Sequence, residues 1–143
     1  MIDLDKQYSL WSPRLLSVMR LAVSLLFFLH GSQKLFGMPS DQVFHPLDTL
    51  SLIWFAGVLE FFGGALLFLG LFTRPVAFIL SGEMAVAYFK AHAPHGFWPP
   101  LNHGELAMLY SFVFLYLVVA GGGAWSLDAV RLHLFGKKRA PES

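Results

Sequence analysis

The feature that most constrains this chain is a long apolar stretch, Leu52 to Phe72, with one carboxylate, Glu60, at its centre. About 20 apolar residues are needed to cross the hydrocarbon core of a bilayer as a helix, so this stretch predicts a transmembrane helix with Glu60 near mid-bilayer. A carboxylate at that depth costs a few kcal/mol. Glu60 is therefore expected to face protein or water, to have a partner, and to belong to a functional site.

The composition of the whole chain agrees with a membrane protein. Of its 143 residues 56% are hydrophobic and only 13% are charged, whereas soluble domains carry roughly 25% charged residues. The net charge of +1 gives no reason to expect nucleic acid as a partner. Because the chain has no cysteine, disulfides, thiol redox relays and cysteine-ligated metal or iron–sulfur centres are excluded for this chain alone.

Four apolar segments predict an all-α, integral-membrane four-helix bundle in contact with the lipid bilayer. The expected helices are 14–36, 52–72, 76–92 and 105–120. The first is expected to start at Ser12-Pro13, because a capping hydroxyl before a proline is typical of a helix N-terminus. Ser126 is expected to cap a short C-terminal amphipathic segment, 127–135. The chain then divides into a polar lead (1–13), a four-helix domain (14–124), and an interfacial segment with a basic tail (125–143).

Lysines and arginines near the ends of the expected helices are distributed unevenly. Most of them fall on one side of a four-helix threading: Lys6, Arg14, Arg74, Arg131, Lys137, Lys138 and Arg139. Lys34 and Lys90 fall toward the other side. Because cytoplasmic ends of membrane spans carry the excess of positive charge, this distribution predicts that both termini are cytoplasmic.

Small residues follow nearly the same helical face as Glu60. They are Gly57, Gly63, Gly64 and Gly70. Since small residues let helix backbones approach closely in a membrane, we expect another helix beside Glu60. The same stripe would also permit a homo-oligomer.

Counting the helical rise from the cytoplasmic boundary places the polar residues at approximate depths. Arg20 and Glu83 share one depth and are expected to form a structural ion pair. Lys34 and Glu105 fall at the outer boundary. A deeper layer holds His30, Glu60, Lys90 and Tyr110.

This polar layer has two main interpretations. Pairs such as Glu60 with Lys90 or His30 would only fix the packing of the bundle. Alternatively, the layer forms a polar pocket that opens outward and binds a polar headgroup or relays protons, with His30 able to change charge near neutral pH. A pore or transporter would require an oligomer.

Histidines in the outer loop are weak candidates for a metal site. His92, His95 and His103 lie there with Glu105, and imidazoles with a carboxylate can hold zinc or copper. Their spacing is loose, however, and the loop is rich in proline. Haem with two histidine ligands is not expected, because His30 is the one histidine clearly inside a predicted span.

Several of these segments together resemble the DoxX family of small bacterial membrane proteins over residues 14–130. They are Arg20, HGSQKLFG (30–37), GVLEFFGGALLFLGLFTRP (57–75), GEMAVAYFKAHAPHGFWPPLNHGE (82–105) and GGGAWSLD (121–128). The resemblance implies a four-helix inner-membrane protein. Its founding members are linked to a thiosulfate:quinone or terminal quinol oxidase system, and others to membrane complexes that handle oxidative and thiol stress. Five residues of this chain fall on the family's recurrent polar positions: Arg20, Lys34, Glu60, Glu83 and Glu105. His30 and Lys90 lie within its motifs.

The resemblance and the polar layer together give our first functional hypothesis, a membrane subunit or accessory factor of a quinone-linked redox system. The residues expected to bind the quinone headgroup are His30, Lys34, Glu60, Lys90 and Tyr110. Glu60 or His30 would move the proton. The alternative is a non-enzymatic assembly or scaffold protein whose outer-loop Phe97 and Trp98 dock a partner subunit. A further alternative is metal handling at the periplasmic face through His92, His95 and His103.

Overall fold

The computed structural model describes residues 4–39 and 47–136, and within these ranges the chain is helical and contains no strand. The helices are α1 (Leu4–Phe36), α2 (Leu52–Leu69), α3 (Thr73–Ala87), α4 (Pro99–Asn102), α5 (Glu105–Ala120) and α6 (Leu127–Gly136). A π-helical turn, η1 (Tyr88–His92), and a 3₁₀ turn, η2 (Ala93–His95), continue α3. Both α1 and α2 are long and apolar enough to cross a membrane, and α5 is a shorter apolar helix. The basic residues Lys137, Lys138 and Arg139 lie outside the described residues.

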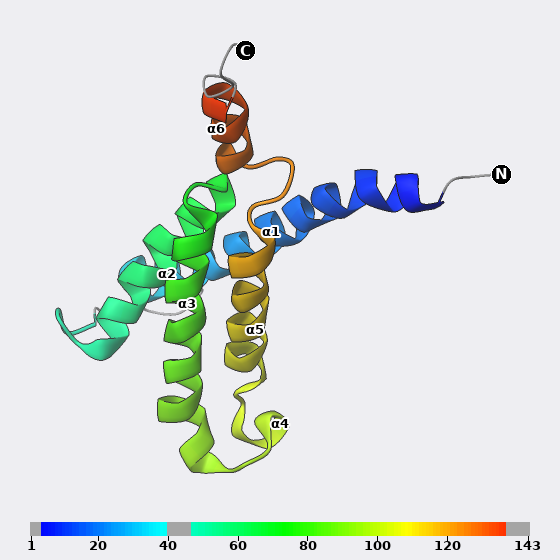
Figure 1. Cartoon of the computed structure of the whole chain (residues 1–143). Coiled ribbons are helices and arrows are strands. Elements are labelled where there is room, and N and C mark those ends of the chain that lie inside the picture. Colours follow the sequence, from blue (N-terminus) through cyan, green and yellow to red (C-terminus); the bar gives the residue numbers. More distant parts are fainter. Residues whose placement is uncertain (1–3, 40–46, 137–143) are drawn as a thin grey trace.

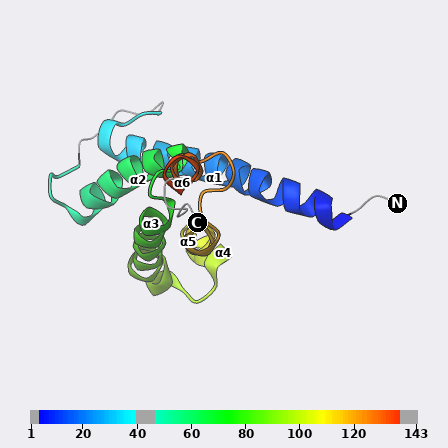
Figure 2. The same ribbon diagram turned by 45° about the horizontal axis from the view of Figure 1, so that its top comes forward.

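The helices are arranged as two packed pairs. The helix α1 packs along α2, and α3 packs along α5. Figure 1 shows that the two pairs are inclined to each other and meet where α2 ends and α3 begins. The N-terminal part of α1 extends beyond the other helices in both views (Figure 2). In Figure 1 α6 projects from the end at which α5 stops. At this end of the bundle α2 and α5 stop and α3 and α6 begin, so four helix termini lie close together.

The α1–α2 pair is held at close range by glycines. A Cβ atom added to Gly31 would lie 2.3 Å from the backbone nitrogen of Phe61, and one added to Gly64 would lie 2.8 Å from that of Phe28. At these positions a side chain would therefore collide with the backbone of the neighbouring helix. This confirms the prediction that small residues near Glu60 admit a second helix.

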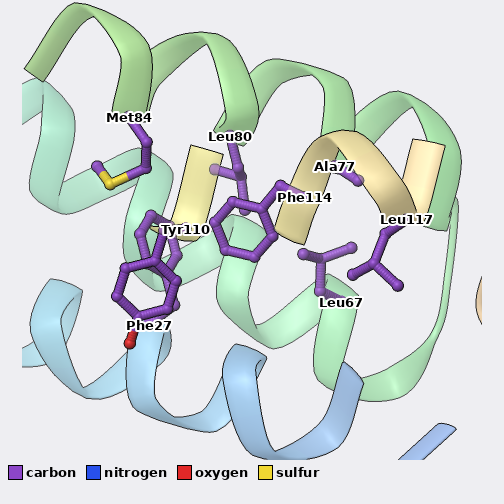
Figure 3. Close-up of a cluster of buried hydrophobic side chains, with 8 residues drawn as sticks. All are labelled: Phe27, Leu67, Ala77, Leu80, Met84, Tyr110, Phe114 and Leu117. Atoms are coloured by element: carbon purple, nitrogen blue, oxygen red, sulfur yellow. The ribbon is translucent and has the colours of Figure 1, made fainter. Parts of the chain in front are cut away.

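The core lies between the two helix pairs and is built from large apolar side chains of α1, α2, α3 and α5 (Figure 3). Phe27 of α1 contacts Phe114 of α5 edge to face, with ring centroids 4.8 Å apart. The outward faces are also apolar. Phe78, Phe112 and Val119, for example, are exposed by 66%, 64% and 73%. An apolar surface around a packed interior is what a lipid environment requires, so the predicted all-α membrane bundle is confirmed.

Several helix boundaries differ from the predicted ones. The helix α1 begins at Leu4, so Pro13 lies inside it and Ser12 does not cap it. An internal proline has no N–H, so the carbonyl four residues earlier, at Ser9, receives no bond from Pro13. The carbonyl of Pro13 accepts from the hydroxyl of Ser17 and the N–H of Ala124. The helix α2 stops at Leu69 because Gly70 adopts a left-handed conformation (φ 66°) that ends it.

The C-terminal part of the fold follows the prediction closely. The bounds of α5, Glu105–Ala120, are the expected ones. The hydroxyl of Ser126 accepts from the N–H of Ala129 at 3.1 Å and so caps α6 as predicted.

Candidate functional site

An ion pair between α1 and α2 lies at the centre of the candidate site. The Nζ atom of Lys34 is 2.5 Å from Oε1 of Glu60. The side chain of Glu60 is 3% exposed and that of Lys34 is 34% exposed. Gly57, one turn before Glu60, provides the space, because a Cβ atom placed there would lie 3.1 Å from Cβ of Lys34. The stem of Lys34 thus passes over a glycine to reach the carboxylate.

The partner of Glu60 is therefore Lys34, whereas Lys90 and His30 were the expected partners. Depth counting placed Lys34 at the outer boundary because it assumed straight helices perpendicular to the membrane. The close packing of α1 against α2 at Gly57 and the length of the lysine side chain bring the two charges together instead.

Glu83 and Tyr110, from the other helix pair, join the ion pair of Lys34 and Glu60. We call these four residues the polar cluster. Glu83 of α3 lies within electrostatic reach of both Glu60 and Lys34, and Tyr110 of α5 lies within reach of Glu60. In Figure 3 the ring of Tyr110 stands beside that of Phe27, 5.2 Å away between centroids. The helices α1, α2, α3 and α5 thus contribute one side chain each to the polar cluster, and Phe27 of α1 packs beside it.

Three carboxylate oxygens of the polar cluster have no hydrogen-bond partner among the described residues. They are Oε2 of Glu60 and both Oε atoms of Glu83, and all three are buried. Most buried polar atoms in proteins are hydrogen-bonded, and exceptions frequently have a functional cause. The polar cluster therefore has a marked excess of acceptor atoms over donors, which a proton or a hydrogen-bonding ligand would balance.

The other predicted site residues lie at or beyond the edge of the polar cluster. His30 is exposed, and its ring stands edge-on to Tyr110 with centroids 6.2 Å apart. Lys90, in the π-helical turn, is exposed and has no hydrogen bond or ion pair with any described residue. Glu105 is exposed in the first turn of α5. Of the predicted layer, Glu60 and Tyr110 come together, whereas Lys90 stays outside.

The outer-loop histidines do not form a metal-binding group. Nδ1 of His92 lies 3.0 Å from the backbone oxygen of Asn102, and His95 and His103 are exposed. Within the described ranges no three His, Cys, Asp or Glu residues are placed to hold a metal ion.

A second polar assembly, which we call the clasp, lies where the helix termini meet and consists of Arg20, Arg74 and Asp128. Arg20 is fully buried. Its Nε donates to the carbonyl of Gly122 at 2.8 Å, its Nη2 donates to that of Trp125 at 2.8 Å, and its Nη1 donates to those of Leu67 and Phe68. The last two carbonyls belong to the final turn of α2, where helices lack internal donors and favour a cation.

The predicted ion pair between Arg20 and Glu83 is therefore wrong. The guanidinium of Arg20 is taken up by backbone carbonyls, and neither carboxylate oxygen of Glu83 has a described partner. Arg20 lies level with the end of α2 and the start of α3, whereas Glu83 lies ten residues further along α3.

The rest of the clasp also joins charged side chains to helix ends. Asp128 accepts from the N–H groups of Phe72 and Thr73 at 2.9 and 2.8 Å and so caps α3 from another helix. Nη1 of Arg74 donates to the carbonyls of Val118 and Val119 at the end of α5. Burial alone would raise the pKa of Asp128, but these hydrogen bonds, with the charge of Arg131, hold it below its usual value.

The clasp was missed in the sequence although its residues stand in recognisable places. Asp128 closes the GGGAWSLD segment, two residues after the Ser126 cap, yet no role was assigned to it. The signal that could have revealed this role is the absence of a capping side chain before α3, where Phe72 takes the cap position.

Helices with apolar outer faces and a buried ion pair between two membrane-length helices define a class, the small helical membrane proteins. This chain belongs to the DoxX family, whose model matches residues 15–93. It is 47% identical over 124 residues to an uncharacterized protein of Haemophilus influenzae, covering 82% of this chain and 91% of that relative. It is 33% identical over 128 residues to an uncharacterized membrane protein of Mycobacterium tuberculosis, covering 76% of each chain. No solved structure matches the chain significantly.

The family match covers only part of the two polar assemblies. It includes Arg20, Lys34, Glu60 and Glu83 but ends before Tyr110. The ion pair thus lies wholly within the matched region.

Proposed function

We propose that this DoxX-family membrane protein is a membrane subunit or accessory factor of a quinone-linked redox or oxidative-stress system, and that its polar cluster binds the quinone headgroup. The observation that most supports this is the set of three buried carboxylate oxygens on Glu60 and Glu83 that have no partner among the described residues. In this proposal the chain lies in the bacterial inner membrane with both termini in the cytoplasm. Partner subunits supply or receive the electrons.

The donor and acceptor set of the polar cluster fits a quinone headgroup. The side chain of Lys34 is 34% exposed, and its ammonium can donate to a carbonyl oxygen while it remains close to Glu60. The orphaned oxygens of Glu60 and Glu83 can accept from a hydroxyl. A bound quinone would supply two-electron, two-proton redox chemistry, which the side chains of this cysteine-free chain cannot provide.

The chain's own residues would hold and move the protons. The carboxylates of Glu60 and Glu83 are the buried groups able to take up a proton inside the cluster. His30 stands between Tyr110 and the exposed surface, where an imidazole can pass a proton outward. Lys90 has no part in this arrangement.

The test is the quinone content of protein extracted gently from its native membrane. We expect near-stoichiometric quinone in the native protein and little in Glu60→Gln, because the amide removes the negative charge opposite Lys34. The matched control is Glu105→Gln, which makes the same chemical change at an exposed position. Equal quinone in native protein and folded Glu60→Gln, or no quinone in the native protein, would contradict the proposal.

A second candidate function, non-enzymatic assembly of a membrane complex, is favoured by the exposed apolar outer loop. Phe97 and Trp98 are exposed by 82% and 64%, and aromatic side chains are enriched at protein interfaces. In that case Trp98→Ala would release a partner subunit during purification, while Glu60→Gln would keep it. A partner retained by variants of both loop aromatics would count against this function.

A further inference from the structure

A cleft beside the clasp is not used by the proposed function. It has a volume of about 950 Å³ and lies between the start of α3, the end of α5, α6 and the neighbouring part of α1. One part of its wall carries two arginines, Arg74 and Arg131, and another part is apolar, with Leu16 and Leu132. The cleft thus combines guanidinium groups with an apolar surface at one end of the helix bundle.

The guanidinium of Arg74 is held with one edge free. Its Nη1 atom donates to the carbonyls of Val118 and Val119 at 2.8 and 2.7 Å, whereas Nε and Nη2 have no hydrogen-bond partner in the described part of the chain. Gly121, at φ 81°, keeps the space beside this edge open, because a Cβ atom there would lie 3.6 Å from Nη2 and 3.7 Å from Nε. Two parallel N–H groups on such an edge match two oxygens of a phosphate.

The second arginine is also oriented without a direct acid partner. The guanidinium of Arg131 lies over the ring of Phe72, 5.4 Å from its centroid, and makes no hydrogen bond with the described residues. The acid in the cleft wall, Asp128, has its two oxygens engaged by the N–H groups of Phe72 and Thr73. Asp128 therefore reduces the charge of the cleft but leaves the N–H groups of both arginines available to an external anion.

We propose that this cleft binds the phosphate of an anionic phospholipid headgroup. The free edge of Arg74 holds the phosphate, Arg131 supplies the second positive charge, and an acyl chain lies along Leu16 and Leu132. The apolar wall favours a lipid over a soluble phosphate. Basic sites between membrane helices on the cytoplasmic side commonly recognise anionic headgroups. This inference is independent of the quinone proposal, because the two sites share no residue.

The experiment measures retention of phosphatidylglycerol and of phosphatidylcholine by the detergent-solubilised full chain, using native mass spectrometry. We expect the native protein to retain phosphatidylglycerol preferentially. Arg131→Gln should weaken this retention roughly tenfold, because a hydrogen-bonded charge contact with the phosphate is lost. Arg74→Lys keeps the charge but removes the paired N–H groups, and it should weaken retention by about the same factor.

Arg14→Gln is the matched control. Arg14 lies over the ring of Trp11 at 5.4 Å, as Arg131 lies over Phe72, but it does not line the cleft. Its loss should change retention by less than about twofold, because this half-buried arginine does not line the cleft. Circular dichroism of each variant verifies the fold.

Three results would overturn the proposal. One is equal retention of the two lipids by the native protein. Another is an equal loss in Arg14→Gln and Arg131→Gln, which would indicate a general charge effect. The third is displacement of phosphatidylglycerol by millimolar inorganic phosphate, which would identify a soluble phosphate compound as the occupant.

Discussion

The clasp and the polar cluster are both assemblies of polar and charged side chains, but Arg20 and Asp128 of the clasp make their hydrogen bonds more completely than the carboxylates of the polar cluster. In the clasp, all three guanidinium nitrogens of Arg20 donate to carbonyls, and both oxygens of Asp128 accept from N–H groups. In the polar cluster, Lys34 satisfies one oxygen of Glu60, and three further carboxylate oxygens have no described partner. A buried unsatisfied acceptor costs about 1–3 kcal/mol.

This difference in hydrogen bonding indicates that the clasp and the polar cluster have different roles. The clasp places cations at the ends of α2 and α5 and an anion at the start of α3, the arrangement that helix dipoles favour. It therefore joins helix termini and stabilises the fold. The polar cluster retains acceptors that stabilise nothing in the protein alone, as expected of a binding or proton-carrying site.

The largest expected effect comes from breaking the clasp. Arg20→Met fills a similar volume but leaves four carbonyls without their donor, and at about 1–3 kcal/mol for each one that is buried the loss should exceed ~3 kcal/mol. Thermal unfolding in detergent, followed by tryptophan fluorescence, should show a large fall of the midpoint. Arg14→Met is the control because Arg14 makes a ring contact but no clasp bond. A midpoint lowered equally in both variants would mean that the carbonyl contacts do not stabilise the fold.

The next largest effect tests the close contact that brings Lys34 to Glu60. In Gly31→Ala the new methyl group would meet the backbone of Phe61 at 2.3 Å, and such overpacking costs about 1–3 kcal/mol. Gly82→Ala makes the same change in α3 where nothing lies within 4 Å, and there alanine should stabilise the helix by up to ~1 kcal/mol. The two substitutions should thus shift the unfolding midpoint in opposite directions. A shift of the same sign would contradict the α1–α2 contact.

These glycines also show how much of the fold the sequence predicts. The membrane-length apolar stretches of α1 and α2, the Ser126 cap and the small-residue face of α2 are local features, and the structure confirms them. The start of α1 was predicted wrongly because Ser12-Pro13 is typical of a helix start. In the structure α1 begins at Leu4 and contains Pro13 as an internal residue.

The candidate site was predicted less completely, for a physical reason. Glu60 stands out because a lone carboxylate in an apolar stretch needs a partner, but the identity of that partner depends on the tilt and rotation of α1. The partners of Arg20 are backbone carbonyls, and a carbonyl has no residue type that a sequence could reveal. Depth alone therefore paired Arg20 with Glu83, and it placed Lys90 beside Glu60.

A smaller effect, of about 1 kcal/mol, is expected from the capping carboxylate of the clasp. In the folded protein the pKa of Asp128 is lowered from its usual value. In the unfolded chain an aspartate has a pKa of ~3.9. Its contribution to stability is therefore present above the unfolded value and is lost as the pH falls through the folded pKa. Asp128→Asn should unfold more easily than native protein at neutral pH, and the difference should shrink on acidification. Asp5→Asn, at an exposed position, should unfold like native protein, and a pH-independent difference for Asp128→Asn would contradict the capping role.

The smallest effect on stability is expected in the polar cluster, and it separates the two proposed functions. Replacing a buried ion pair by apolar side chains is often neutral, so the double variant Lys34→Met, Glu60→Leu should unfold within about 1 kcal/mol of native protein. Lys34→Met alone should be less stable than the double variant, because it leaves the buried carboxylate of Glu60 without its counter-charge. If the cluster binds quinone, the stable double variant will retain none. A double variant as unstable as Arg20→Met would instead make the ion pair a structural element, and the assembly function would then account better for this chain.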